Sequence, residues 1–365
     1  MLNSLLKKSF SSLLYSARPS ICMDITAWAK NRQLPIIELH SPVIQELISH
    51  VAEDEFAKAE FDEHREVLER YQILVPIEKA YIRDSLGVVE LPDGQLCYEG
   101  NWWVNYLLKS HSYKRRVYFK NRFLKGNWYS LNGMWSNSYY HWFHDILPRL
   151  ETAFQFLPPD TKFLIHENPC AYQLQSLEAY GITCDRLEIQ PQGVRSGVER
   201  LWLSTPLGHT GLGSGQVITR VAKRLIKHML PTMEKAQSLS IYISRKKAAS
   251  RRIVNENDFL PLLKERGFQE VVLEDLHWEE QIRLFFGATA IMGAHGAGLI
   301  NMMFVDKKNI PLTEITGQKR TVPCYVILAG QLGMQFRRIH AEPIGDYEIA
   351  DMRLPLRYIM SGNQF

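Results

Sequence analysis

The 365-residue sequence lacks several features that mark particular classes of protein. It contains no C-x-x-C pair, and its five cysteines are scattered, so neither a zinc site nor a disulfide framework is indicated and a reducing compartment is expected. No apolar run reaches the length of a membrane span. The net charge of +4 is small, and no basic run is long enough to follow a phosphate backbone. We therefore expect no nucleic-acid partner.

The chain is longer than the size at which one hydrophobic core keeps growing, so we expect more than one domain. Four glycines fall within Gly208–Gly215, which favours a hinge there. The expected division is a helical segment over residues 1–70, an N-terminal α/β domain over 71–213, a Rossmann-like nucleotide-binding domain over 214–345, and a tail over 346–365.

The first eighteen residues alternate leucines with lysine and serine and do not form a signal-peptide core. They predict an amphipathic helix that packs on the protein or, alternatively, touches a membrane surface. We therefore expect a cytoplasmic protein, with peripheral membrane contact as the alternative. A charged helix is predicted over residues 51–68, and a strand over 115–119.

From residue 162 onward, short apolar strands alternate with helices, which predicts mainly parallel sheets covered on both faces. The predicted strands span residues 162–166, 201–204, 240–244, 270–273, 289–293 and 310–315. The predicted helices span residues 171–180, 216–229, 256–266 and 278–286. The second half therefore has a Rossmann-like order, in which ligands bind beyond the carboxyl ends of the strands.

The most informative stretch is Thr289–Phe304, read as T-A-I-M-G-A-H-G-A-G-L-I-N-M-M-F. A strand ends at Gly293, a turn with three glycines surrounds His295, and a helix begins near Ala297. This order lets backbone amides approach a phosphate in front of the positive end of a helix dipole. The stretch predicts phosphate binding, whereas a purely structural turn needs fewer glycines.

Cationic and acidic groups are expected at the same edge of the sheet. The strand ending near Ser244 is followed by R-K-K-A-A-S-R-R, which supplies Arg245, Lys246, Lys247, Arg251 and Arg252. Arginine suits a diphosphate because its guanidinium binds in a fork, although not all five cations are expected to do so. Glu314 ends the strand after the glycine turn, where a carboxylate commonly accepts ribose hydroxyls. These features fit NAD as well as a nucleotide sugar.

A second motif, N-S-Y-Y-H-W-F-H-D-I-L-P-R-L, covers Asn137–Leu150. In a helix capped by Asn137 or Ser138, His144 and Asp145 follow His141 on one face, and Pro148 predicts a kink or an early end. A His-Asp pair is typical of a general base. A metal site and a purely structural role are the alternatives, although no further ligand sits at a suitable spacing for a metal.

Three stretches together resemble glycosyltransferase family 61. They are Y-Y-H-W-F-H-D-I-L-P-R-L, Y-I-S-R-K-K-A-A-S-R-R-I-V-N-E and G-A-H-G-A-G-L-I-N-M-M-F, and they occur in the family's order at similar spacings. The later C-Y-V-I-L-A-G-Q-L-G-M-Q-F-R-R-I is similar too, so the resemblance spans about Asn137 to His340. It implies a GT-B fold, with two Rossmann-like domains facing across a cleft, and inverting transfer from a nucleotide sugar without an obligatory metal.

The resemblance also implies roles for residues. It assigns the donor phosphates to the glycine-histidine motif, to Arg245 and to Arg252, and it matches Glu314 to the carboxylate after that motif. Within the glycine-histidine motif, the residues assigned to the donor in this way are Gly293, His295, Gly296, Ala297 and Gly298. It matches His141 and Asp145 to the helix facing the cleft. His144 departs from the apolar residue of many members, which leaves the identity of the base open.

No D-x-D pair occurs in the chain, although GT-A enzymes commonly use one to hold a metal on the donor diphosphate. We expect a glycosyltransferase of surface polysaccharide synthesis, transferring a hexose or pentose to a glycan, a lipid-linked glycan or a protein. No metal or cofactor is expected; a nucleotide sugar, with UDP as the first choice, is the co-substrate. One alternative is a nucleotide-sugar-binding partner that no longer catalyses transfer. The other is an NAD-dependent oxidoreductase, although the chain contains no evident catalytic Tyr-x-x-x-Lys motif.

Overall fold

The computed structural model describes residues 20–40, 59, 63, 71–99, 120–208, 211–232, 237–317, 322–345 and 350–360. The predicted amphipathic N-terminal helix and the strand predicted over 115–119 lie outside these ranges. Of the charged helix predicted over 51–68, only Ala59 and Glu63 are described. Across the described ranges, no helix combines the length and apolar character that crossing a membrane requires.

The chain forms two compact units. The N-terminal unit includes residues 71–137 and 145–210, and the C-terminal unit includes residues 138–144 and 211–365. The later boundary lies within the glycine-rich stretch Gly208–Gly215. The short segment 138–144 differs from the expected division, because it packs with the C-terminal unit although the chain on both sides of it belongs to the N-terminal unit.

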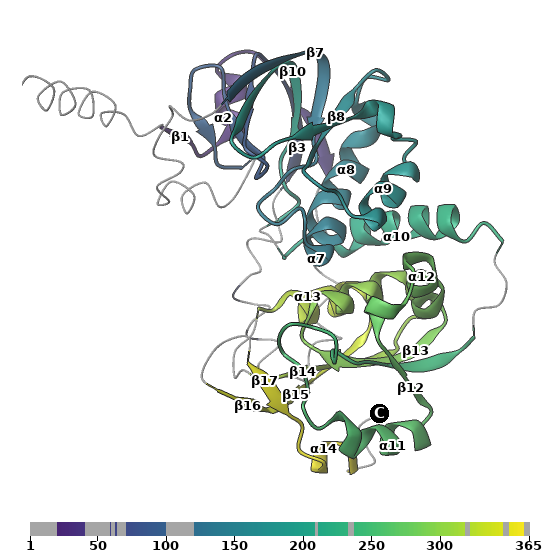
Figure 1. The fold of residues 1–365 in the computed structure, drawn as a ribbon. Helices are drawn as coiled ribbons and strands as arrows, with labels where there is room; N and C mark the ends of the chain where they lie inside the picture. Colours follow the sequence, from purple (N-terminus) through teal and green to yellow (C-terminus); the bar gives the residue numbers. More distant parts are fainter. Residues whose placement is uncertain are drawn as a thin grey trace, which may run out of the picture. The chain divides into compact units, whose positions relative to one another are not determined.

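The C-terminal unit is built on a five-stranded, fully parallel sheet in the order β12-β11-β13-β14-β15 (Figure 1). The strands are β11 (Leu239–Ile243), β12 (Phe268–Val271), β13 (Ala288–Ala294), β14 (Pro311–Thr316) and β15 (Gln335–His340). In chain order this is 2-1-3-4-5, a doubly wound arrangement. The Rossmann-like order predicted for this half agrees with it.

Helices cover both faces of this sheet: α12 and α13 lie on one face, and α11 and α14 on the other (Figure 1). The helices are α10 (Gly215–Met229), α11 (Glu256–Glu265), α12 (Trp278–Phe286), α13 (Cys324–Leu332) and α14 (Arg357–Met360). Two 3-10 helices, η5 (Leu273–Asp275) and η6 (Ala297–Phe304), follow β12 and β13. The apolar positions of α10 recur at helical spacing and are buried, which explains how it packs.

The expected tail over 346–365 is instead part of this unit where the structure describes it. A small antiparallel pair joins β16 (Glu342–Ile344) to β17 (Asp351–Arg353), and α14 follows. Met352, Leu354 and Ile359 belong to the same buried cluster as Tyr242 and Phe259. Apolar residues at these late positions therefore complete the core on the α11 face.

The N-terminal unit contains a ten-stranded mixed sheet. Four strands, in the order β9-β8-β7-β10, are parallel, and the remaining pairings are antiparallel apart from β1 with β6. The strands are β1 (Ile21–Cys22), β2 (Ile37–His40), β3 (Gln72–Glu78), β4 (Tyr81–Arg83), β5 (Val88–Glu90), β6 (Leu96–Cys97), β7 (Lys120–Ser130), β8 (Lys162–His166), β9 (Leu187–Gln190) and β10 (Val194–Ser204).

The prediction of two Rossmann-like domains is therefore met only in part by the N-terminal unit. Its parallel strands follow the order 3-2-1-4 of half a Rossmann sheet. The consecutive strands from β3 to β6 are joined by tight turns, with left-handed backbone at Lys79, Gly87 and Gly94, and a tight turn returns the chain antiparallel. In the described part of this unit the helices are α2 (Ile25–Lys30), α8 (Leu147–Ala153), α9 (Ala171–Glu178) and the short 3-10 turns η3 (Phe154–Phe156) and η4 (Cys184–Arg186).

The histidine motif forms one continuous helical segment. It comprises α7 (Tyr139–His141), the π-helical η2 (Trp142–Ile146) and α8 (Leu147–Ala153). Ser138 takes the N-cap position, with no side-chain cap bond. Proline lacks an N–H and its ring collides with the carbonyl four residues earlier, here that of His144. The wider π turn directly before Pro148 accommodates that ring, so the chain continues as a helix instead of ending early.

The packing of α14 predicts unequal effects at two neighbouring positions. Ile359 is fully buried and Met360 is 67% exposed. Replacing Ile359 with Ala should lower the free energy of unfolding by about 2–5 kcal/mol, because it removes core volume. Met360→Ala should change it by less than about 0.5 kcal/mol. Urea unfolding of both variants checks this, and equal effects would show that α14 is not part of the core.

Candidate functional site

Chain order reverses in the C-terminal sheet between β11 and β13, which are adjacent strands. In open α/β sheets, ligands bind beyond the carboxyl ends of the strands at such a point. Arg245 comes two residues after β11 ends, and His295 directly follows β13. The basic loop after β11 and the glycine turn after β13, which are the two main segments predicted to bind phosphate, therefore lie at the same edge of the sheet.

Arg245 packs directly against the glycine turn. A Cβ atom at residue 296 would lie 2.0 Å from Nη1 and 2.7 Å from Cζ of Arg245, so only glycine leaves the guanidinium in this position. The other glycines of the motif also allow close packing: a Cβ at Gly293 would lie 3.0 Å from Cβ of Ile243, and one at Gly298 would lie 2.5 Å from Cδ1 of Leu273. Ala297 is the first residue of η6.

The Arg245 guanidinium is only partly satisfied by the protein. Its Nη2 donates to the carbonyl oxygen of Ser250 at 3.1 Å, whereas its buried Nε has no acceptor. Burial, followed by the positive charge of Arg251, lowers the pKa of Arg245. Both effects disfavour the cation, and an anion bound beside it would relieve them.

His295 is held by a buried carboxylate. Its Nδ1 lies 2.6 Å from Oε1 of Glu314, and Nε of Arg338 donates to Oε2 of Glu314 at 2.9 Å. The Glu314 side chain is fully buried. Because both of its oxygens are engaged inside the protein, Glu314 orients His295 in this structure. A contact of Glu314 with ribose hydroxyls stays a prediction.

The electrostatics of Glu314 reflect two opposing effects. Burial favours the neutral acid, but the hydrogen bonds and positive charges of His295 and Arg338 outweigh burial and lower the pKa of Glu314. The carboxylate therefore stays ionised at neutral pH. A bond from Nδ1–H to this carboxylate directs Nε2 of His295 away from Glu314.

An aromatic contact links the glycine turn to the start of the histidine motif. Tyr325 donates its hydroxyl to the carbonyl oxygen of Gly296 at 2.6 Å, and its ring packs edge-on against His295, with centroids 5.1 Å apart. The ring of Tyr140 packs edge-on against Tyr325 at 5.4 Å. In addition, Tyr139 donates its hydroxyl to Oδ1 of Asn301 in η6 at 2.6 Å. Helix α7 is thereby attached to the glycine turn and η6 within one unit.

The three candidate bases have different environments. His144 is buried, its ring stacks on Tyr140 at 4.9 Å, and its Nε2 accepts from the backbone N–H of Gly213 at 3.4 Å. His141 and Asp145 are partly exposed. His144 thus has a structural environment, and His141 and Asp145 remain the accessible candidates. The structure assigns His141 to the C-terminal unit and Asp145 to the N-terminal unit.

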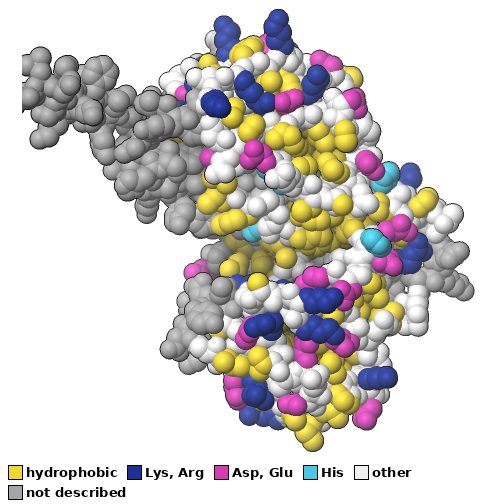
Figure 2. Space-filling view, viewed as in Figure 1, with side chains coloured by type: hydrophobic (Ala, Val, Ile, Leu, Met, Phe, Trp, Pro, Cys, Tyr) yellow, Lys and Arg dark blue, Asp and Glu magenta, His cyan; other side chains and the backbone are white. Residues whose placement is uncertain are grey.

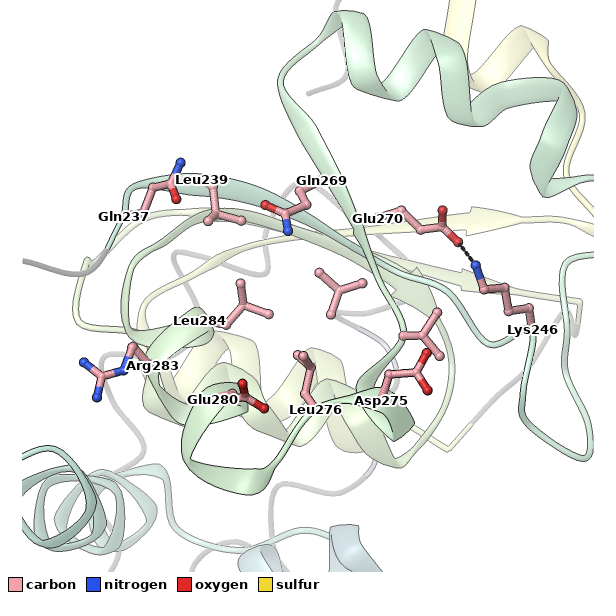
Figure 3. Close-up of a pocket in the computed structure, with 12 residues that line it drawn as sticks. Gln237, Leu239, Lys246, Gln269, Glu270, Asp275, Leu276, Glu280, Arg283 and Leu284 are labelled. Carbon is pink, nitrogen blue, oxygen red and sulfur yellow. Dashed lines mark hydrogen bonds and ion pairs between the residues drawn. The ribbon is translucent and has the colours of Figure 1, made fainter.

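The other cations of the basic loop have carboxylate partners. Lys246 Nζ lies 2.7 Å from Oε1 of Glu270, and Lys247 pairs with Asp275. Arg252 donates from Nε to Oδ2 of Asp351 at 2.9 Å. The Lys246–Glu270 pair lies at the rim of a cavity of about 560 Å³ between β12 and α12 (Figure 3). Neither Arg245 nor His295 lines this cavity.

Charge is balanced in the same way over the wider surface. On the face shown in Figure 2, Lys and Arg side chains of the C-terminal unit alternate with Asp and Glu, and no large patch of one sign forms. In the described ranges, no group of three His, Cys, Asp or Glu side chains is placed to hold a metal ion. His141, His144 and Asp145 therefore do not form such a group.

Sequence reasoning missed Arg338, Tyr325 and Tyr140 as parts of the site. A signal for Arg338 was present, since Q-F-R-R-I-H places two adjacent arginines in an apolar strand, where successive side chains point to opposite faces. One of the two therefore had to point inward and find a carboxylate. No comparable signal distinguishes the tyrosines, because Tyr is abundant in this chain and common in ordinary cores.

The buried carboxylate predicts a pH-dependent contribution to stability. Glu314→Gln leaves Arg338 buried without its counter-ion and should lower the free energy of unfolding by about 3–5 kcal/mol at pH 7. Because the folded pKa is lowered, this contribution is complete above the ordinary value of 4.5 and is lost as the pH falls through the folded pKa.

Unfolding in urea at several pH values checks both parts. The difference between wild type and Glu314→Gln should shrink at acid pH. Glu188→Gln, which breaks the more exposed pair with Arg122, should change stability by at most about 1 kcal/mol and is the control. A pH-independent difference for Glu314→Gln would contradict the assigned ionisation.

A comparison with models of known protein families gives a match for this chain. The family model described as Glycosyltransferase 61 matches residues 139–311. A search of curated proteins finds no match. The matched region runs from the first residue of α7 to the first residue of β14, and it contains Arg245, Gly296 and His295. The resemblance noted in the sequence is thereby confirmed, and the match supports membership of this chain in glycosyltransferase family 61.

Proposed function

We propose that this protein is an inverting glycosyltransferase that moves a sugar from a nucleotide-sugar donor to a hydroxyl acceptor. The observation that carries the proposal is the packing of Arg245 against Gly296, beside His295, at the point where strand order reverses. This arrangement lies inside the region matched by the family. It presents positive charge and a glycine turn where a departing diphosphate needs them.

Charge stabilisation is the main chemical role assigned to the C-terminal unit. As the bond to the anomeric carbon breaks, negative charge develops on the diphosphate. The Arg245 guanidinium has a buried Nε–H without an acceptor, and His295 is held in place by Glu314. Groups fixed in advance need no reorganisation at the moment of reaction, so their stabilisation of the leaving group is large.

Proton removal from the acceptor is assigned to Asp145 or His141. One of them accepts the proton as the acceptor oxygen attacks the anomeric carbon in a single displacement. A well-placed base contributes about 10²–10⁴-fold. The proposal includes a GT-B arrangement, a UDP-linked donor, no metal requirement and a glycan, lipid-linked glycan or protein acceptor in surface polysaccharide synthesis, at the cytoplasmic side of a membrane.

A donor screen tests the proposal most directly. Thermal unfolding of the full chain is followed with UDP-, GDP-, CMP- and dTDP-linked sugars, and with NAD. A ligand at one hundred times its dissociation constant adds about 2.7 kcal/mol to stability. Stabilisation by one nucleotide-sugar class, followed by transfer to a mixed acceptor set, supports the enzyme. Binding without turnover would identify a silent binding protein, and preference for NAD would identify an oxidoreductase.

Replacing Asp145 with Asn should lower the rate of transfer by about 10²-fold or more and leave the donor dissociation constant nearly unchanged. The change removes a proton acceptor but keeps the shape of the side chain. Glu151→Gln, one to two turns later in the same helical segment, should retain transfer and is the matched control. Initial rates and calorimetric donor binding separate the two effects. Full activity of Asp145→Asn would assign the proton to His141.

Gly296→Ala should weaken binding of a nucleoside diphosphate by about 10- to 100-fold, because the new Cβ displaces the guanidinium of Arg245. If this is the mechanism, Gly296→Ala should have little further effect in a chain that already carries Arg245→Ala. Calorimetry on the two single variants and the double variant measures this coupling. Independent, additive losses would argue that residue 296 acts other than through Arg245.

A further inference from the structure

The five cations of the loop Arg245–Arg252 divide into two groups by their partners. Lys246, Lys247 and Arg252 each pair with a carboxylate: Glu270, Asp275 and Asp351. Across the described chain, Arg245 and Arg251 have no carboxylate partner. Arg245 donates only to the Ser250 carbonyl, and its Nε is buried without an acceptor. The protein therefore neutralises three charges of this loop and leaves two.

The guanidinium group of Arg245 lies against the backbone next to Arg251. Its Nη2 donates a hydrogen bond to the carbonyl oxygen of Ser250, the residue directly before Arg251. After burial, the charge of Arg251 is the strongest influence lowering the pKa of Arg245, and both charges act on the Tyr325 hydroxyl beside the glycine turn. Each positive charge disfavours the other, and an anion bound near both would offset this repulsion.

The backbone explains how Arg251 is held there. Arg251 has φ of 56°, in the left-handed region that side chains other than glycine rarely adopt. Such a conformation persists only when its surroundings fix it. Arg252 supplies the fixing contacts: its backbone N–H donates to Oδ1 of Asp351 at 2.9 Å, and its carbonyl accepts from Met352 N–H at 2.8 Å. Arg252 thus anchors the loop on β17.

We propose that Arg251 is the second arginine that binds the donor, so that Arg245 and Arg251 together hold a diphosphate and Arg252 is a positioning residue. The ligand class is the diphosphate of a nucleoside diphosphate or its sugar ester. This assignment rests on the proposed function, and it transfers to Arg251 the contact that the family resemblance gave to Arg252. Two guanidinium forks match the two phosphoryl groups, each of which accepts bidentate bonds.

The test measures binding of inorganic pyrophosphate and of UDP, GDP, CDP and dTDP to the full chain by calorimetry. Arg251→Gln should weaken pyrophosphate and the preferred nucleoside diphosphate by about 10- to 100-fold, the range for a lost charge-assisted contact. Lys247→Gln removes the same charge from the same loop and should change both constants by less than about threefold, because Asp275 already neutralises Lys247.

Two results would overturn the assignment. The first is that both dissociation constants of Arg251→Gln stay within threefold of wild type. The second is that Lys247→Gln weakens binding as much as Arg251→Gln does, which would indicate general electrostatics. Failure of wild type to bind pyrophosphate or any of the nucleotides would also overturn it. Thermal unfolding of each variant confirms that it is folded.

The same measurements separate this inference from the proposed function. Arg251-dependent pyrophosphate binding without binding or turnover of any nucleotide sugar would leave the anion site standing and remove the glycosyltransferase proposal. Sugar transfer by Arg251→Gln with the donor KM of wild type would keep the glycosyltransferase and remove the role of Arg251. A rise in donor KM with little change in acceptor KM supports both together.

Discussion

The site in the C-terminal unit depends on one buried carboxylate. Glu314 lies in a strand interior to the sheet, with no exposure to solvent, where an unpaired charge costs several kcal/mol. His295, directly after β13, and Arg338, in β15, approach it from the two neighbouring strands. The register of three strands is therefore linked to a single charge, and the same link fixes the ring of His295 at the carboxyl end of β13.

The glycine turn connects this group of side chains to the basic loop Arg245–Arg252. The absence of a Cβ at residue 296 leaves room for the guanidinium of Arg245, and Tyr325 holds the same residue by donating its hydroxyl to the Gly296 carbonyl. The loop around Arg245 is basic by composition, but its ion pairs with Glu270, Asp275 and Asp351 neutralise Lys246, Lys247 and Arg252. The geometry of the pairs, more than the number of cations, therefore determines which positive charges of the loop have no carboxylate partner in the described chain.

Much of this could be read from the sequence, because local patterns determine it. The strand, glycine turn and helix of Thr289–Phe304 and the parallel sheet around them follow from apolar runs and glycine spacing. The partners of charged residues could not be read. Arg252 meets Asp351 ninety-nine residues later, and Glu314 meets Arg338, because sheet register brings them together. The mixed N-terminal sheet was missed since short hairpin strands carry weak signals.

The helical segment of the histidine motif is divided between the two units, so its two ends have different surroundings. Tyr139, Tyr140 and Phe143 pack on Asn301, Tyr325 and Trp278, so the first part of the segment, including His141, is fixed relative to the glycine turn. Asp145 belongs to the other unit, and the π-helical turn before Pro148 lies between the two assignments. His141 therefore takes its position from the C-terminal unit, whereas Asp145 belongs to the N-terminal unit. The π-helical turn before Pro148 thus contains the boundary between the units to which the two proposed bases belong.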